Sequence, residues 1–246
     1  MTKYCYSNNN LFDVDKDSPL LTADKAQSFY TIVAKLLFLA KRGCPDILTA
    51  IAFLTTCVTK PSRDNNEKLD RVLRYLRHTN HLILTLESDG SGDIKWMADA
   101  SFAVHRDMKS HTGGGGTMGK GYFYATSTRQ KLNAKSSTEA KLVAADDLLT
   151  SLLWTRNFLL AQGYKVEHCT LMQDNLSAMQ LEQNGRASSG KRTRHINICY
   201  FYITSKIDDG SIRVLHQPTD MMVADLLTKP LQGSTFRRFR QLLLNE

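Results

Sequence analysis

Four acidic residues each stand in a separate segment of the sequence, where a strand pattern meets a turn or a helix pattern begins. They are Asp99, Glu139, Asp174 and Asp225. Only folding can bring carboxylates so far apart in sequence together, and once together they repel one another unless cations neutralise them. Oxygen ligands of this kind suit the hard cations Mg²⁺ and Mn²⁺. The sequence therefore predicts a divalent-metal site built from these four residues.

Each of the four also has a local explanation, which the sequence leaves open. Asp99 could face water from the edge of its strand, although a charge inside an apolar strand is costly unless it is paired. Ser136 and Glu139 fit a capping box, in which the Glu satisfies a backbone N–H at the start of a helix. Asp174 fits a helix N-cap, and Asp225 fits the polar face of a short helix. The metal site is therefore a hypothesis about the four residues taken together.

The composition is that of a globular protein with a polyanionic partner. The chain has 246 residues, 42% of them hydrophobic, a formal net charge of +8 and a pI near 9.2, which favours nucleic acid. Its five cysteines form no C-x-x-C pair, so we expect a reducing compartment and no disulfide framework. We find no basic-then-apolar leader and no apolar run of about 20 residues, so we expect neither secretion nor a membrane partner.

The periodicity predicts helices first and a sheet afterwards. Helical patterns cover residues 24–42, 45–60 and 65–77, and the turn cluster Ser88–Asp93 marks a domain boundary. Strands and helices then alternate in the order strand 94–104, strand 112–118, strand 121–126, helix 137–161, strand 170–173, helix 175–181, helix to about 209, strand 211–217 and helix 222–228. This order predicts an α/β fold with a mixed sheet and helices packed on it.

Two groups of basic residues are candidates for binding nucleic acid. The first recurs every three residues on a predicted helix, as a phosphate-binding stripe or as an ordinary solvated face: Lys68, Arg71, Arg74 and Arg77. The second is the densest basic patch and follows the Gly/Ser-rich loop 185–190: Lys191, Arg192, Arg194 and His195. Arginine suits phosphate by geometry, and cations at a helix N-terminus oppose its dipole, so the second patch favours a phosphate partner over a plain helix start.

Five short motifs occur in order along the second part of the chain. They are Ala98–Ser101, Leu132–Ala140, Gln173–Ala178, Arg192–Ile198 and Ala224–Pro230. Together they resemble the ribonuclease H fold, and more closely the ribonuclease H of copia-type long-terminal-repeat retrotransposons, over about residues 93–232. The earlier segments Leu37–Ile47 and Arg71–Leu76 resemble the end of that family's reverse transcriptase, where the polymerase joins the nuclease.

The resemblance implies a ribonuclease H-like mixed five-stranded sheet with flanking helices, preceded by a small helical module. It implies an endonuclease that cuts the RNA strand of RNA–DNA hybrids with two Mg²⁺ ions, or Mn²⁺, held by Asp99, Glu139, Asp174 and Asp225. The products would carry a 3′-hydroxyl and a 5′-phosphate. Further site candidates are His216 for proton transfer, and Ser101 and Asn175, in the motifs, for contacts to the hybrid.

The sequence pattern of the first residues and the resemblance together predict a division of the chain, and the resemblance implies a cellular setting. We expect a poorly ordered segment 1–22, the connection-like helical tail of a reverse transcriptase at 23–90, a ribonuclease H-like domain at 91–232 and a C-terminal helix at 233–246. The expected partners are the RNA–DNA hybrid and the upstream reverse transcriptase portion of the polyprotein. We expect the protein in the cytoplasm, including retrotransposon particles.

Two departures from the family pattern keep a second function open. Lys141 stands where the family usually has a second acidic residue, and Cys199 stands where it often has Arg. The polymerase palm is also absent, because neither Asp146-Asp147 nor Asp208-Asp209 follows the aromatic-x pattern of that motif. A catalytically decayed remnant that only binds nucleic acid is therefore the alternative.

Two other classes of enzyme fit the sequence less well. Gly114–Lys120 nearly matches a phosphate-binding P-loop, but Gly121 replaces the hydroxyl residue and a strand pattern follows, so we interpret the glycine run as easing tight strand turns. Asp146 and Glu182 have the spacing of an integrase, but Asp146 falls in mid-helix, two turns after Glu139. Neither nucleotide hydrolysis nor strand transfer is expected.

Overall fold

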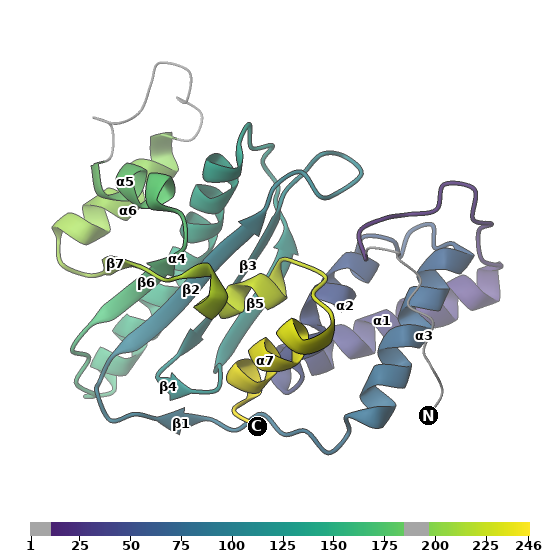
Figure 1. Cartoon of the computed structure of the whole chain (residues 1–246), viewed down its shortest axis with the longest axis horizontal. Helices are drawn as coiled ribbons and strands as arrows, with labels where there is room; N and C mark the ends of the chain where they lie inside the picture. Colours follow the sequence, from purple (N-terminus) through teal and green to yellow (C-terminus); the bar gives the residue numbers. More distant parts are fainter. Residues whose placement is uncertain (1–10, 185–196) are drawn as a thin grey trace.

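The computed structural model describes residues 11–184 and 197–246. Figure 1 shows a group of helices from the first third of the chain beside a sheet that carries its own helices. The final helix α7, Gly233–Leu244, lies between these two parts. No helix within the described ranges is both long and apolar enough for a membrane span.

The main sheet has five strands in the spatial order β5-β3-β2-β6-β7. Strands β3 and β5 run antiparallel to their neighbours, whereas β2, β6 and β7 are parallel to one another. The bounds are β2 Ile94–Ser101, β3 His111–Thr117, β5 Tyr124–Arg129, β6 Cys169–Gln173 and β7 Arg213–His216. The structure confirms the predicted mixed five-stranded sheet with flanking helices and a preceding helical part, which is the ribonuclease H-like fold class.

Helix α4, Ser137–Ala161, is the principal support of the sheet. Its N-terminus is capped by Ser136, whose Oγ accepts a hydrogen bond from the Glu139 N–H at 3.1 Å. Its apolar side chains pack with Trp96 of β2 and Leu171 of β6 in one buried core. Helices α5, Leu176–Asn184, and α6, Asn197–Asp208, extend the same helical layer.

The other face of the sheet is covered by the segment η5 and by the helical part of the chain. The element η5, Val223–Leu227, is a short 3₁₀ helix at the position of the predicted helix 222–228. Its Leu227 is buried in the core of the helical part, and the Thr49 hydroxyl donates a 2.6 Å hydrogen bond to the Leu226 carbonyl. The helical part therefore packs directly against the segment that carries Asp225.

The helical part contains four elements, and their order matches the sequence pattern. They are α1 Ala23–Arg42, η1 Pro45–Ile47, α2 Leu48–Thr55 and α3 Arg63–His78. The second helix ends earlier than predicted, and α3 begins with a capping box formed by Ser62 and Asn65. Residues 1–10 of the segment expected to be poorly ordered lie outside the described residues. Phe12 of the same segment is buried and packs edge-on against Phe53.

The connection between the paired strands β3 and β5 contains Gly119–Lys120. These residues form the short strand β4, which pairs antiparallel with β1, Glu87–Ser88, more than thirty positions earlier. The ion pair between Lys120 and Glu87, at 3.0 Å, lies on this pairing. The partner strand is distant in sequence, so the local Gly-Lys pattern could not reveal it.

The interpretation of the glycine run as easing tight strand turns is wrong. Gly113–Gly116 lie in the middle of β3, which is paired on both sides. A Cβ atom at Gly113 would meet the Leu227 carbonyl at 2.6 Å, and one at Gly114 would meet the Met97 carbonyl at 2.5 Å. Glycine is required here because helix, strand and 3₁₀ segment approach the strand too closely for any side chain.

Candidate active site

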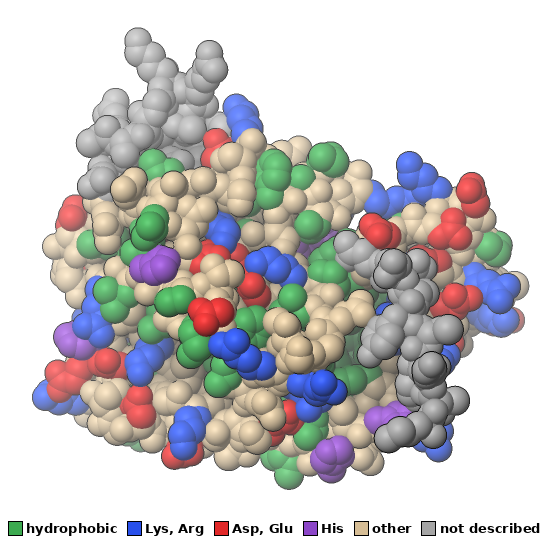
Figure 2. Space-filling view, viewed as in Figure 1, with side chains coloured by type: hydrophobic (Ala, Val, Ile, Leu, Met, Phe, Trp, Pro, Cys, Tyr) green, Lys and Arg blue, Asp and Glu red, His purple; other side chains and the backbone are tan. Residues whose placement is uncertain are grey.

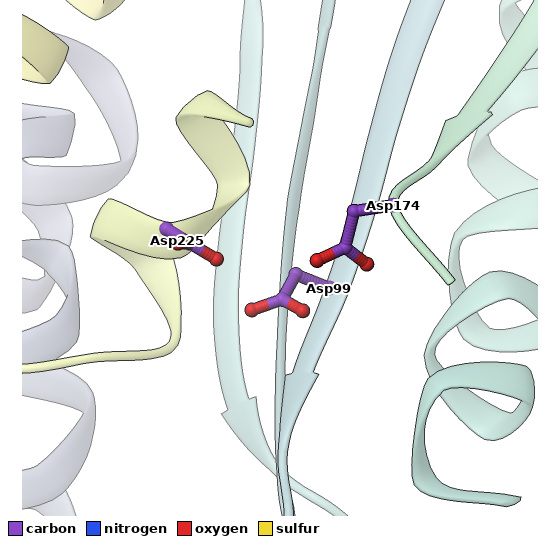
Figure 3. A group of neighbouring side chains, drawn as sticks. All are labelled: Asp99, Asp174 and Asp225. Carbon is purple, nitrogen blue, oxygen red and sulfur yellow. The ribbon is translucent and has the colours of Figure 1, made fainter. Parts of the chain in front are cut away.

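Three of the four predicted carboxylates come together at one edge of the sheet. Asp99 lies in β2, Asp174 directly follows β6, and Asp225 lies in η5. One oxygen from each lies within 4.8 Å of the others. Figure 3 shows Asp99 in the middle, with Asp174 and Asp225 approaching it from opposite sides.

The strand register explains why two of these residues meet. Strands β2 and β6 are parallel neighbours, and Met97 pairs with Met172 at the end of their ladder. Asp99 and Asp174 each come two residues later, so both stand at the same carboxyl-terminal edge. Such edges are where sheets covered by helices collect their ligands. Asp225 completes the cluster because η5 packs across β2 and β3.

Asp99 is completely buried and is the most strongly held of the three. Its Oδ2 accepts a 2.5 Å hydrogen bond from the Thr228 hydroxyl, and the Lys229 ammonium lies 3.7 Å from the same oxygen. The Lys141 ammonium lies 2.9 Å from Oδ1. Burial alone would raise the pKa of Asp99, but the two lysines and the Thr228 hydroxyl outweigh it and lower the pKa to about 2.

The pKa of Asp225 is shifted in the opposite direction. Burial and the neighbouring charge of Asp99 raise the pKa of Asp225 to about 6, although Lys229 donates a 2.6 Å hydrogen bond to its Oδ1 and opposes the shift. The two carboxylates therefore repel each other even with a lysine present. A cluster that keeps such repulsion in a buried place is typical of a functional site.

Lys141 is the functional residue that the metal-site prediction did not include. It lies near the start of α4 and forms ion pairs with both Asp99 and Asp174, and its side chain is only 10% exposed. Burial alone would lower the pKa of Lys141, but the two carboxylates raise it above its ordinary value, so the ammonium is charged. The sequence did indicate this residue, because Lys141 stands where the ribonuclease H pattern of copia-type retrotransposons usually has an acidic residue.

Glu139, by contrast, lies outside the cluster of carboxylates that the described part of the chain forms. It is buried, and its Oε2 accepts a 2.7 Å hydrogen bond from the backbone N–H of Lys135. With the Ser136 cap, this arrangement is close to the capping box that the sequence left open, except that Glu139 binds the N–H of Lys135 and not that of Ser136. The structure therefore favours a structural role for Glu139 over the predicted role as a metal ligand.

Replacing Glu139 by Ala should cost roughly 1 kcal/mol of stability, the usual effect of losing an N-terminal capping contact. The affinity of the chain for Mn²⁺ should stay within twofold, because Glu139 contacts none of the three aspartates. Urea unfolding and calorimetric Mn²⁺ titration measure the two effects. Asp174→Ala is the matched comparison, and a loss of Mn²⁺ affinity as large as in that variant would return Glu139 to the ligand set.

The remaining predicted site residues lie around the cluster in different roles. His216 is exposed at the end of β7 and pairs with Gln173, the residue before Asp174. The Ser101 hydroxyl donates a 2.9 Å hydrogen bond to the Thr228 carbonyl. Thr228 is thereby held from both sides, since its own hydroxyl donates to Asp99. Asn175 accepts a 3.0 Å hydrogen bond from the Ala178 N–H at the start of α5.

The two predicted basic groups have different outcomes. Arg71 and Arg74 are exposed on α3, whereas Lys68 is paired with Asp64 and lies over the Phe53 ring. The second group lies outside the described residues: Lys191, Arg192, Arg194 and His195. Figure 2 shows acidic and basic side chains next to one another at the centre of the visible face, where η5 lies in Figure 1.

A cavity of about 490 Å³ lies beside the carboxylate cluster, between α3 and the segment that leads into α7. Lys229, which pairs with Asp225, is one of the residues that line it. Four further cationic side chains line the rest, namely Lys68, Arg71, Arg237 and Arg240. The acidic residues Asp46, Asp64 and Glu67 share the lining, so the cavity is mixed in charge with an excess of cations.

The chain is similar to two long polyproteins of plant transposons. It is 30% identical over 218 residues, 87% of its length, to the retrovirus-related Pol polyprotein from transposon TNT 1-94 of Nicotiana tabacum. It is 30% identical over 210 residues, 85% of its length, to that from transposon RE1 of Arabidopsis thaliana. The chain belongs to the retrovirus-related Pol polyproteins of copia-type transposons. It spans 16% and 14% of the length of these two Pol relatives.

No family model matches the chain. Among solved structures, LC11-RNase H1, isolated from compost, superposes with a TM-score of 0.42 at 14% identity, and the match covers 55% of the Pol segment and 92% of that chain.

Proposed function

We propose that this Pol segment is a ribonuclease H, an endonuclease that needs divalent cations and cleaves the RNA strand of an RNA–DNA hybrid. One observation carries the proposal: Asp99, Asp174 and Asp225 come from three distant segments and meet at a sheet edge, where Asp99 and Asp225 are buried and Asp174 is partly buried. Burying mutually repelling carboxylates is costly for stability. Such an arrangement points to a function that uses the charge.

The residues present fit a divalent cation. All three ligands are carboxylate oxygens, which suit Mg²⁺ and Mn²⁺. Asp99 Oδ1 is buried, and its one polar contact among the described residues is the ion pair with the Lys141 ammonium at 2.9 Å. Asp99, Asp174 and Asp225 would hold the metal. When bound, such ions activate the attacking water and stabilise the leaving oxygen.

The chain's own residues position this centre. Ser101 holds the Thr228 carbonyl, and the Thr228 hydroxyl fixes Asp99 Oδ2, so the central carboxylate has one orientation. Lys229 neutralises part of the charge on Asp225. His216, exposed at the end of the neighbouring strand β7, is the candidate for moving a proton to or from bulk water.

The hybrid would be held by cations on both parts of the molecule. Arg71 and Arg74 on α3 are exposed, and Arg71 lines the same cavity as Lys229. These side chains are suited to phosphates, whereas contacts to the 2′-hydroxyls would select RNA. In the same proposal, residues 23–90 are the end of the reverse transcriptase, residues 91–232 are the nuclease, and the setting is the cytoplasm or a retrotransposon particle.

Cleavage of an end-labelled RNA–DNA hybrid by the purified chain tests this function. We expect Mg²⁺-dependent cleavage that leaves 3′-hydroxyl and 5′-phosphate ends, and none with EDTA. Asp174→Asn should lower the rate at least about 100-fold, because it removes a ligand charge. Binding of the hybrid should stay within twofold. Equal cleavage by the two proteins would reject the site.

A hybrid-binding module without cleavage is the second candidate function. The observation that favours it is the Lys141 ammonium, which contacts Asp99 and Asp174 inside the carboxylate cluster. A positive charge there repels any incoming cation. Hybrid binding without cleavage, in both the wild-type chain and Asp174→Asn, would decide for this candidate.

A further inference from the structure

The position of Lys141 relative to the carboxylates is that of a bridging cation. Its ammonium lies 2.9 Å from Asp99 Oδ1 and also forms an ion pair with Asp174 Oδ1. A metal ion held by these same two oxygens would occupy the place of the ammonium. The ammonium and such an ion therefore exclude each other.

The two lysines of the cluster differ in how easily their ammonium groups can move away from the carboxylates. The Lys229 side chain is 37% exposed, so its ammonium can leave Asp225 and Asp99 and be hydrated by solvent. The Lys141 side chain is 10% exposed and belongs to a helix packed on the sheet. Removing its ammonium from Asp99 and Asp174 would leave a buried cation without its partners, which is strongly unfavourable.

We propose that Lys141 permanently takes the place of one of the two divalent cations. The cluster then accepts a single divalent cation, which displaces the ammonium of Lys229 and not that of Lys141. This inference rests on the proposed function in one respect, namely that the carboxylates bind metal at all.

Charge balance supports a single ion. The three carboxylates carry three negative charges, and one divalent cation together with the Lys141 ammonium supplies three positive ones. Two divalent cations beside Lys141 would leave two uncompensated positive charges in a site where Asp99 is completely buried. An excess of that size in a poorly solvated pocket is prohibitive.

Counting bound Mn²⁺ on the full chain, without nucleic acid, tests the inference. Calorimetric titration should find one ion per wild-type chain and one more in Lys141→Glu, which replaces the ammonium by a carboxylate. Lys141→Gln, which removes the charge without adding a ligand, should bind Mn²⁺ at least about tenfold more tightly than wild type. Lys35→Glu, the same charge change at an exposed position of α1, should match wild type in both stoichiometry and affinity.

Three results would overturn the inference: two ions in the wild-type chain, no ion in the wild-type chain, or an unchanged number of ions in Lys141→Glu. Circular dichroism and urea unfolding without metal establish that each variant folds. If Lys141→Glu does not fold, the Mn²⁺ affinity of Lys141→Gln still decides the test. Hybrid cleavage is measured in parallel. A wild-type chain that binds one ion but cleaves nothing refutes the proposed function alone, whereas a chain that cleaves but gains no ion in Lys141→Glu refutes the inference alone.

Discussion

Asp99→Asn should reduce Mg²⁺-dependent cleavage of an RNA–DNA hybrid by at least about 1,000-fold, the upper range for loss of one charged group at a catalytic centre. Asp99 is the middle carboxylate of the cluster and the only one in ion-pair contact with both Lys141 and Lys229. Its loss removes the ligand that any cation in the pocket would share. Single-turnover cleavage with saturating protein measures the chemical step separately from binding.

The same substitution should leave the protein folded. Asn keeps the shape of Asp99 and can still accept the hydrogen bond from Thr228. Each lysine also keeps a second carboxylate, Asp174 for Lys141 and Asp225 for Lys229. Asp208→Asn, the same change at an exposed position of α6, is the control and should cleave at the wild-type rate. A decrease of less than tenfold in Asp99→Asn would show that the cluster is not the reactive centre.

Gly114→Ala should destabilise the protein by about 3 kcal/mol, at the high end for overpacking a core position. The added Cβ would lie 2.2 Å from Leu148 Cδ1 and 2.5 Å from the Met97 carbonyl oxygen. Leu148 can change rotamer, but Met97 belongs to the central strand β2 and is paired on both sides. Strand β3 must therefore move away from either β2 or α4, and both movements open the core.

The melting temperature should fall by about 10 °C for a destabilisation of this size in a chain of this length. Gly43→Ala is the matched control, because a Cβ there meets nothing within 4 Å and the backbone φ is −147°. That variant should stay within about 0.5 kcal/mol of wild type. If Gly114→Ala unfolds at the same urea concentration as Gly43→Ala, the close packing of β3 against β2 and α4 does not limit stability.

The elements with strong local signals could be predicted almost to the residue. Helix α4 runs over Ser137–Ala161 as expected, because its Ser cap and its apolar period are both encoded locally. The mixed sheet followed from the order of strand and helix patterns. Strand β4 did not follow, because its two residues owe their conformation to a partner in β1.

The composition of the site could be predicted only in part, for a reason of helix geometry. Asp99 and Asp174 end neighbouring strands, so the sheet pattern alone brings them together. Glu139 and Lys141 are two positions apart on α4, and two helical positions differ by about 200° around the axis. Which of them faces the sheet edge depends on how α4 packs, and the sequence pattern carries no such information. The packing directs Lys141 to the carboxylates and Glu139 to the backbone of Lys135.

The hydrogen bond from Thr49 to the Leu226 carbonyl ties the helical part of the chain to the segment that carries Asp225. Helix α2 holds the segment of Asp225 in place, because Leu227, two residues further on, packs among the apolar side chains of the helices. A fragment that begins at residue 91 would lose this contact and expose Leu227 to water. The position of Asp225 therefore depends on the helical part of the chain, so the proposed domain boundary near residue 90 does not separate two independently packed units.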